Sequence, residues 1–258
     1  MQSQNIIIIG SGNVATHLAK ALFSKDHHIL QIWSREFDHA ALLANQVSAH
    51  PIDKLDLIRT DADIYILAVR DDALFDLALD LRFRDSLVLH TSGSVSMSVL
   101  RYVSRHHGVI WSPQSFVRDV PMDYSALPFC IEASDKSSMQ KLNDLLSDIS
   151  SHVFSIDGEQ RRWLHLASVM VNNFGNALNA LAQDLLHAQD IPFEILHPLI
   201  SITADKIKQN KNLWQLQTGP AIRRDQKTID EHRRMLASQP QLLQLYDLMT
   251  QFISDATH

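Results

Sequence analysis

The sequence predicts a mostly parallel, doubly wound α/β domain followed by an all-α domain. In the first half, short apolar runs alternate with segments of helical periodicity, a pattern typical of a parallel sheet covered by helices. Residues 6–9 are four consecutive isoleucines, as expected of a strand buried on both faces. From Asp157 to His258 the sequence contains no strand pattern. We therefore predict a first domain at residues 1–156 and a helical second domain at residues 157–258.

The predicted elements follow one another along the chain. The strands are at residues 6–9, 29–33, 64–69, 87–89, 109–111, 129–132 and 153–156. One helix follows the first strand, where apolar residues from Val14 to Leu22 repeat at helical spacing, and another is at residues 137–149. The helices of the second half are at residues 159–187, 193–209, 222–236 and 240–253.

The composition is that of an ordinary globular protein and excludes several classes. The 258 residues are 45% hydrophobic and 20% charged, with a net charge of −6, so we expect no nucleic-acid partner. We expect neither a membrane span nor a signal peptide, because no apolar window of about 20 residues exists. The single Cys130 lies in an apolar run, which indicates a buried strand residue rather than a reactive thiol and suits the reducing cytoplasm. The 14 histidines show no ligand spacing, so we predict no metal.

A glycine turn follows the first predicted strand and opens the first helix. Residues 10–15 have the form G-x-G-x-x-A, in the strand–turn–helix context that the dinucleotide fingerprint requires. The first glycine permits the turn, the second lets the backbone approach a pyrophosphate, and the helix N-terminus attracts the phosphates. A turn that binds nothing is the alternative, and the all-helical second half disfavours a methyltransferase. The sequence therefore predicts a Rossmann domain that holds a dinucleotide through Gly10, Ser11, Gly12, Asn13 and Val14.

The end of the second predicted strand favours NADP over NAD. Rossmann domains specific for NAD usually place an acid there, whereas this chain has Ser34 and Arg35. A guanidinium can pair with a 2′-phosphate, and a hydroxyl can donate a hydrogen bond to it. In the alternative, Arg35 is a solvated loop residue and Glu36 binds the ribose of NAD.

Polar residues follow three other strands, at the sheet edge where ligands bind in this class of fold. Ala68 and Val69 end the central strand, Ser92 follows the next, and residues 111–116 follow the third. We expect Ala68, Val69 and Ser92 to contact the cofactor, and the third segment to orient a substrate. The alternative for each is ordinary turn and cap chemistry, since Ser, Asp and Gly favour such positions.

The helical half offers candidate substrate residues. On the long helix His165 and Asn173 lie at spacings that place them near one side, and buried asparagines are costly unless bonded. A histidine there could pass the proton that accompanies hydride transfer. Farther on, Thr218-Gly219-Pro220 reads as a helix start with Arg223 in its first turn, suited to an anionic group. The alternatives are a helix–helix hydrogen bond and a well-capped structural helix.

Several of these segments occur together in one known family. The glycine turn, the Trp33-Ser34-Arg35 strand end, the His90-Thr91-Ser92-Gly93 segment, the helix with His165 and Asn173, and residues 218–232 resemble a Rossmann-like family whose C-terminal half is a domain of unknown function. That family is related to pyrroline-5-carboxylate reductase and to the 3-hydroxyisobutyrate and 6-phosphogluconate dehydrogenases. The resemblance implies a Rossmann domain and a helical domain that forms a homodimer.

The related dehydrogenases place a Lys and an Asn on the long helix. Here Arg162 or His165 stands near the Lys position, and Asn173 matches the Asn. The chain also has Trp111-Ser112-Pro113-Gln114 where the family has His-Pro-x-Gln.

Two functions are compatible with these residues. The first is an NADP-dependent oxidoreductase that moves a hydride to or from a small, polar, carboxylate-bearing substrate, with His165, Asn173 and Arg223 at the substrate. The second is a non-enzymatic protein that senses a nucleotide or binds a partner on a Rossmann scaffold.

Overall fold

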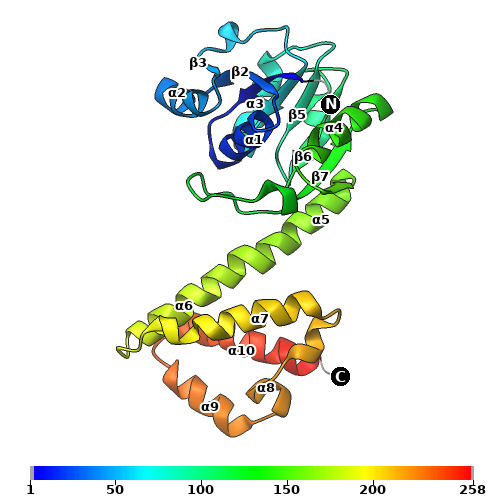
Figure 1. Cartoon of the computed structure of the whole chain (residues 1–258). Helices are drawn as coiled ribbons and strands as arrows, with labels where there is room; N and C mark the ends of the chain where they lie inside the picture. Colours follow the sequence, from blue (N-terminus) through cyan, green and yellow to red (C-terminus); the bar gives the residue numbers. More distant parts are fainter. Residues whose placement is uncertain (1–2, 257–258) are drawn as a thin grey trace. The chain divides into compact units, whose positions relative to one another are not determined.

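The computed structural model describes residues 3–256, of which residues 5–155 contain an eight-stranded sheet (Figure 1). The strand order is β3-β2-β1-β4-β5-β6-β7-β8. All neighbouring strands are parallel except β6 and β7, which run antiparallel. The strands are β1 (Asn5–Ile9), β2 (His28–Trp33), β3 (His50–Ile52), β4 (Ile64–Leu67), β5 (Leu87–His90), β6 (His107–Trp111), β7 (Pro128–Ala133) and β8 (His152–Ser155).

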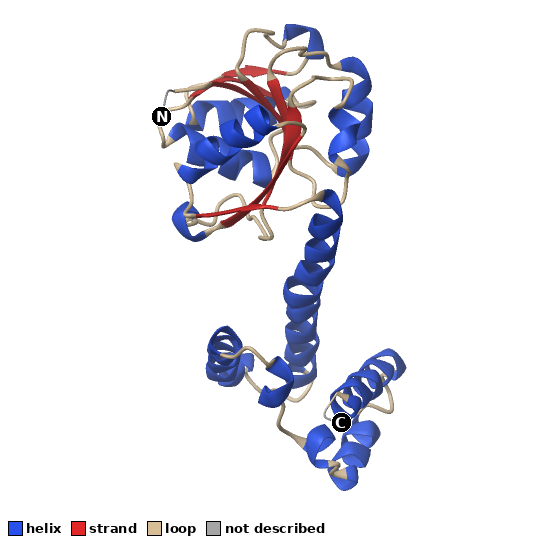
Figure 2. Cartoon of the chain, turned by 90° about the vertical axis from the view of Figure 1, so that its right-hand side faces the viewer, coloured by secondary structure: helices blue, strands red, loops and turns tan. Residues whose placement is uncertain are grey.

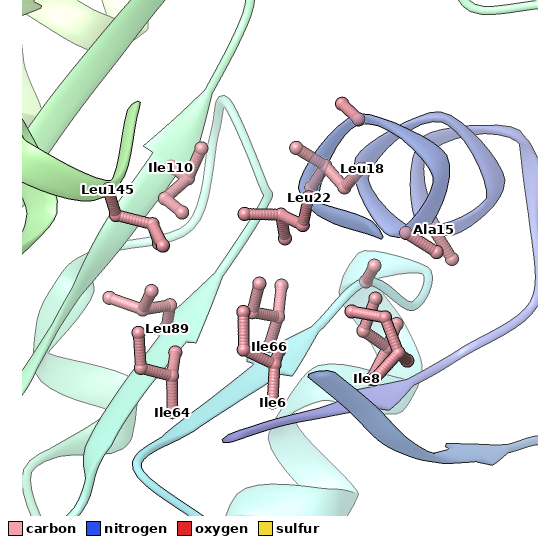
Figure 3. Close-up of a cluster of buried hydrophobic side chains, with 14 of the residues drawn as sticks. Ile6, Ile8, Ala15, Leu18, Leu22, Ile64, Ile66, Leu89, Ile110 and Leu145 are labelled. Carbon is pink, nitrogen blue, oxygen red and sulfur yellow. The ribbon is translucent and has the colours of Figure 1, made fainter. Parts of the chain in front are cut away.

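Helices cover both faces of this sheet (Figure 2). They are α1 (Asn13–Phe23), α2 (Phe37–Gln46), α3 (Asp71–Asp80) and α4 (Lys136–Ser147). Side chains of β1 alternate between the faces: Ile6 and Ile8 pack in one core cluster, and Ile7 and Ile9 in the other. Figure 3 shows the first cluster, in which Leu18 and Leu22 of α1 face the sheet. Each isoleucine is fully buried, and burial of this kind contributes about 2 kcal/mol per side chain.

The edge strand β3, of three residues, was not predicted from the sequence. Its middle residue is Pro51, which has no N–H to donate and is therefore tolerated only at an edge or bulge. Cys130 lies buried on β7, as predicted, and burial raises the pKa of its thiol. The buried thiol is thus less reactive than an exposed one.

The long helix predicted at residues 159–187 is present but changes its geometry in the middle. It consists of α5 (Gly158–Ser168), a π-helical segment (Val169–Phe174) and α6 (Gly175–His187). Asp157 caps its start, since its carboxylate accepts from the backbone of Glu159 and Gln160.

The chain divides into two compact units between Leu178 and Asn179. The strands end at Ser155, close to the predicted boundary between residues 156 and 157, but α5 keeps its contacts with the sheet and so belongs to the first unit. The domain boundary between residues 156 and 157 therefore stays a prediction. The described part of the second unit contains α7 (His197–Gln209), α8 (Pro220–Arg223), α9 (Gln226–Met235) and α10 (Pro240–Asp255).

The single helix predicted at residues 222–236 is wrong. The chain leaves helical geometry at Arg224, which adopts a left-handed conformation with φ of 53°. Asp225 then starts α9, because its carboxylate accepts from the backbone N–H and the hydroxyl of Thr228. The start at Pro220 is correct, but it opens only the one-turn helix α8. Among residues 3–256, no helix is long and apolar enough to cross a membrane.

Candidate active site

The glycine turn joins β1 to α1 in a conformation that depends on its two glycines. Gly10 has a φ of 124°, and a Cβ there would overlap the carbonyl oxygen of Ala68 at the end of β4. A Cβ on Gly12 would meet no atom within 4 Å. Gly10 therefore allows the turn to approach β4, whereas Gly12 leaves open space for an approaching ligand.

The N-terminus of α1 is suited to an anion. Gly12 is its N-cap, and among the described residues no side chain caps it and its first turn contains no acid. The first N–H groups of the helix are thus available to a phosphate, which the helix dipole also attracts. This donor set fits the diphosphate of a dinucleotide.

A pocket of about 330 Å³ opens beside the turn. Gly10, Ser11 and Gly12 line it together with Ser34 and Arg35, and the Ser11 hydroxyl donates to the Ser34 hydroxyl over 3.0 Å. Its remaining wall is formed by Trp33, Glu36, His39, Ala68, Val69, Arg70, Ala73 and Arg118. Three arginines and one carboxylate line the pocket, so its charge suits a phosphorylated nucleotide. The structure brings Arg35, the predicted 2′-phosphate ligand, and Glu36, its alternative, to the same pocket.

Three of the predicted cofactor residues make other contacts. The Asn13 amide donates to the carbonyl oxygen of Phe116, and Val14 lines a small cavity of about 80 Å³ next to Trp111. Ser92 is buried, and its hydroxyl accepts from the backbone N–H groups of Ser94 and Val95. Ser92 thus stabilises a turn, which was the alternative to a role in cofactor binding. Its contact with a cofactor stays a prediction.

A second pocket, of about 590 Å³, brings His165 and Asn173 together. Trp111 at the end of β6 and residues 112–115 after it form one wall, and residues of α5 and the π-helical segment form the other. The half-buried His165 ring lies 5.9 Å from the Trp111 ring, and a Cβ on Gly93 would be 2.6 Å from its Cδ2 atom. Gly93 therefore makes room for the imidazole. Asn173 is exposed rather than buried, so no internal hydrogen bond is needed to satisfy it.

Arg223 stands apart from this set. It belongs to the second compact unit, where it is exposed at the end of α8. Its role at the substrate stays a prediction.

Arg161, which anchors the long helix, was not predicted from the sequence. It is 1% exposed and donates to the Glu132 carboxylate on β7 and, over 2.6 Å, to the carbonyl oxygen of Val95. His165 follows one turn later on the same side of α5. Arg161 thus fixes the helix from which His165 reaches the pocket, whereas Arg162, its neighbour, is exposed.

His90, at the end of β5, is a second missed residue. It is fully buried, and its Nδ1 accepts from the backbone N–H of Ser92 over 3.2 Å. Burial, reinforced by the charge of Arg161, lowers the pKa of His90 to about 3. The imidazole is therefore neutral at physiological pH and supports the turn that carries Ser92 and Gly93.

Two protein families match parts of the chain. Residues 5–92 match the family described as NADP oxidoreductase, coenzyme F420-dependent, and residues 127–253 match the domain of unknown function DUF2520. No curated protein matches the chain.

Solved structures match it along its length. A putative NADP oxidoreductase from Bacteroides fragilis is 38% identical, with a TM-score of 0.91 and 98% of each chain covered. A 1-pyrroline-5-carboxylate reductase from Streptococcus pyogenes is 14% identical, with a TM-score of 0.68 over 98% of this chain and 99% of that chain. A reductive aminase from Aspergillus terreus, in complex with NADPH and ethyl-5-oxohexanoate, is 14% identical, with a TM-score of 0.69 over 99% of this chain and 94% of that chain. At 14% identity, the likeness of this chain to the two reductases shows a shared fold and no more. These matches confirm the predicted fold class and family resemblance.

We expect His90 to make the folded protein sensitive to acid. Its pKa is about 3 in the folded chain against 6.5 for an ordinary histidine, so between these values the unfolded chain binds the extra proton. The stability that a neutral His90 provides is present above pH 6.5 and is lost as the pH falls toward 3. Between pH 7 and pH 5 the free energy of unfolding should fall by about 2 kcal/mol from this group. Denaturant unfolding at pH 7 and at pH 5 measures this change. In His90→Gln the free energy of unfolding should fall by about 2 kcal/mol less between these two pH values than in the wild type, and an equal fall in both proteins would contradict the assignment.

We expect Arg161→Ala to destabilise the protein by about 3–5 kcal/mol, because it leaves the Glu132 carboxylate without its buried partner. Arg59→Ala is the matched control, since the Arg59–Asp61 pair is exposed and screened by solvent, so its loss should destabilise the protein far less. Urea unfolding of both variants measures the difference. Equal losses would show that Arg161 does not anchor the helix.

Proposed function

The chain belongs to the NADP oxidoreductase family that joins a Rossmann-like domain to a DUF2520 domain, and from this premise we propose that it reduces the carbon–nitrogen double bond of a small, polar, carboxylate-bearing substrate. Family membership makes it an NAD(P)-dependent oxidoreductase, in place of the non-enzymatic alternative. The observation that carries the proposal is the 590 Å³ pocket in which His165 and Asn173 meet the residues that follow β6.

The glycine-turn pocket is where the chain would hold NADP. Gly12 and the N-terminus of α1 would receive the diphosphate, and Ser34 and Arg35 the 2′-phosphate. When bound, the reduced cofactor supplies a hydride to the substrate carbon. The single cysteine is free and buried, which suits a reducing compartment, and we place the activity in the cytoplasm.

The second pocket supplies the groups that a substrate would need. Among the described residues that line it, His165 is the one imidazole, and it would give a proton from the ring to the substrate nitrogen as that atom gains electron density. The amides of Asn173 and Gln114 would donate to the carboxylate. The Trp111 ring packs against His165 and fixes its direction. The likeness to pyrroline-5-carboxylate reductase and reductive aminase supports this choice of double bond.

We also propose that two copies associate through the helical half. Among the described residues of the second unit, only Ala221, Ile229 and Leu236 are buried apolar side chains. Large apolar residues of the same unit are exposed, among them Leu199, which is 60% exposed. A unit of this size with so few buried side chains lacks the core that folding requires, and a second copy of the same apolar surface would cover it.

We expect the purified enzyme to oxidise NADPH in the presence of a cyclic imine carboxylate, and much less with the same imine lacking its carboxylate. His165→Ala should lower kcat by about 100-fold or more, because the proton donor is lost, while the NADPH Kd stays unchanged. His152→Ala removes an exposed histidine of β8 and is the control. Loss of NADPH absorbance gives the rates. Tight NADPH binding without turnover of any imine would refute the proposed reaction.

We expect a dimer in sedimentation experiments, and Leu199→Asp should convert it to a monomer by placing a charge in the apolar surface. Leu79→Asp is the matched control, since Leu79 is 73% exposed on α3 of the first unit. A monomeric wild-type protein, or dimers in both variants, would contradict this interface.

A further inference from the structure

The loop between β6 and β7 passes from one pocket to the other. Its first residues, Ser112–Ser115, line the larger pocket, and the chain then crosses the start of α1. Two side chains of α1 hold it there. The Asn13 amide donates to the carbonyl oxygen of Phe116 over 2.9 Å, and the His17 ring bonds the carbonyl oxygen of Val117 over 2.9 Å. The loop is therefore fixed on the helix that begins at the glycine turn.

Arg118 is the next residue of this loop, and it reaches the glycine turn itself. Its guanidinium donates to the carbonyl oxygen of Ser11 over 2.8 Å, and its side chain lines the cofactor pocket. Arg70, which lines the same pocket, pairs with Asp72 over 2.9 Å. Within residues 3–256, no carboxylate pairs with Arg118 in this way.

The surroundings of Arg118 favour an anion. The guanidinium lies next to the positive end of α1, where the described residues provide neither a cap side chain nor a first-turn acid. Two positive groups side by side repel each other unless an anion neutralises them. One N–H group binds Ser11, and a guanidinium has five, so others remain for phosphate oxygens.

We propose that Arg118 is a ligand of the cofactor diphosphate, contributed by the loop that also lines the substrate pocket. The contact with Ser11 places it at the turn that receives the diphosphate, whereas Arg35 follows β2 on the side of the adenosine ribose. Arg118 thus serves both nicotinamide cofactors, and Arg35 selects the phosphorylated one. This inference rests on the cofactor site of the family and is independent of the substrate that we propose.

One consequence concerns the order of binding. Ser112–Ser115 and Arg118 are close together in the same loop, so a diphosphate that holds Arg118 also restrains the wall of the substrate pocket. Substrate should therefore bind more tightly to the cofactor-loaded enzyme than to the free enzyme.

Calorimetric titration with NADPH and with NADH tests the proposal. Arg118→Ala and Arg118→Gln should each weaken both cofactors by the same factor, about 10- to 100-fold, since a charge-assisted hydrogen bond is lost. Arg118→Gln keeps an N–H donor for Ser11 and so separates the charge from the loop contact. Arg118→Lys, which keeps the charge, should recover part of the affinity.

Two further variants serve as controls. Arg35→Ala should weaken NADPH alone, and Arg105→Ala should leave both cofactors within about twofold, because Arg105 pairs with Asp85 on the surface and lines neither pocket. Binding of both cofactors by Arg118→Gln as tightly as by the wild type would overturn the proposal, as would a loss confined to NADPH. Turnover of imines by the wild type, with unaltered cofactor binding in the Arg118 variants, would refute this inference and leave the proposed reaction standing.

Discussion

The close approach of the glycine turn to β4 is the constraint on which the rest of the site depends. Gly10 donates its N–H to the carbonyl oxygen of Trp33 over 2.8 Å, and the Ala68 N–H donates to Ile9 over the same distance. The ends of β1, β2 and β4 are thus joined by backbone bonds around one residue with a left-handed conformation. These backbone hydrogen bonds fix where the chain segments that carry Ser34, Arg35 and Val69 begin. The backbone therefore determines where the pocket beside the glycine turn lies, and the side chains determine its charge.

A second group of contacts links the sheet to the helix that carries His165. Arg161 reaches β7 through Glu132 and the turn after β5 through Val95, so one side chain connects three elements. Its charge also helps to keep His90 neutral. A buried ion pair adds little net stability compared with apolar packing, but it tolerates few other geometries. The value of Arg161 therefore lies in the position it gives to α5 more than in the free energy of folding.

Most of the fold was predictable from local patterns. The isoleucine run predicted β1, and the glycine turn predicted the Rossmann topology. Gly10, Ser11 and Gly12 line the pocket beside that turn, whereas Asn13 and Val14 do not, and the contact of these residues with a cofactor stays a prediction. Local patterns could not predict which side chains contact each other across the fold. Arg161 and Arg162 are adjacent arginines, and the position of Glu132 decides which of the two is buried. Arg118 lies in an irregular loop whose path depends on Asn13 and His17.

The same limit applies to the helical half. Periodicity predicted the helices, but the break at Arg224 depends on the cap that Asp225 forms with Thr228. The position of Arg223 was inferred from a helix start that proved to be a single turn. In this half, hydrophobic periodicity predicts where the helices lie but not where each one ends. A single hydrogen bond from a capping side chain can end a helix that the periodic pattern would continue.

The π-helical segment at Val169–Phe174 sets the direction of the side chains that follow it. In an α-helix each residue advances by about 100°, so the face presented by Arg161 and His165 would dictate the direction of every later side chain. A π turn takes in an additional residue and shifts that phase by a fixed angle. The side chains of α6 therefore point in directions that an unbroken α-helix would not give them, and deletion of one residue from the segment would turn them about the helix axis.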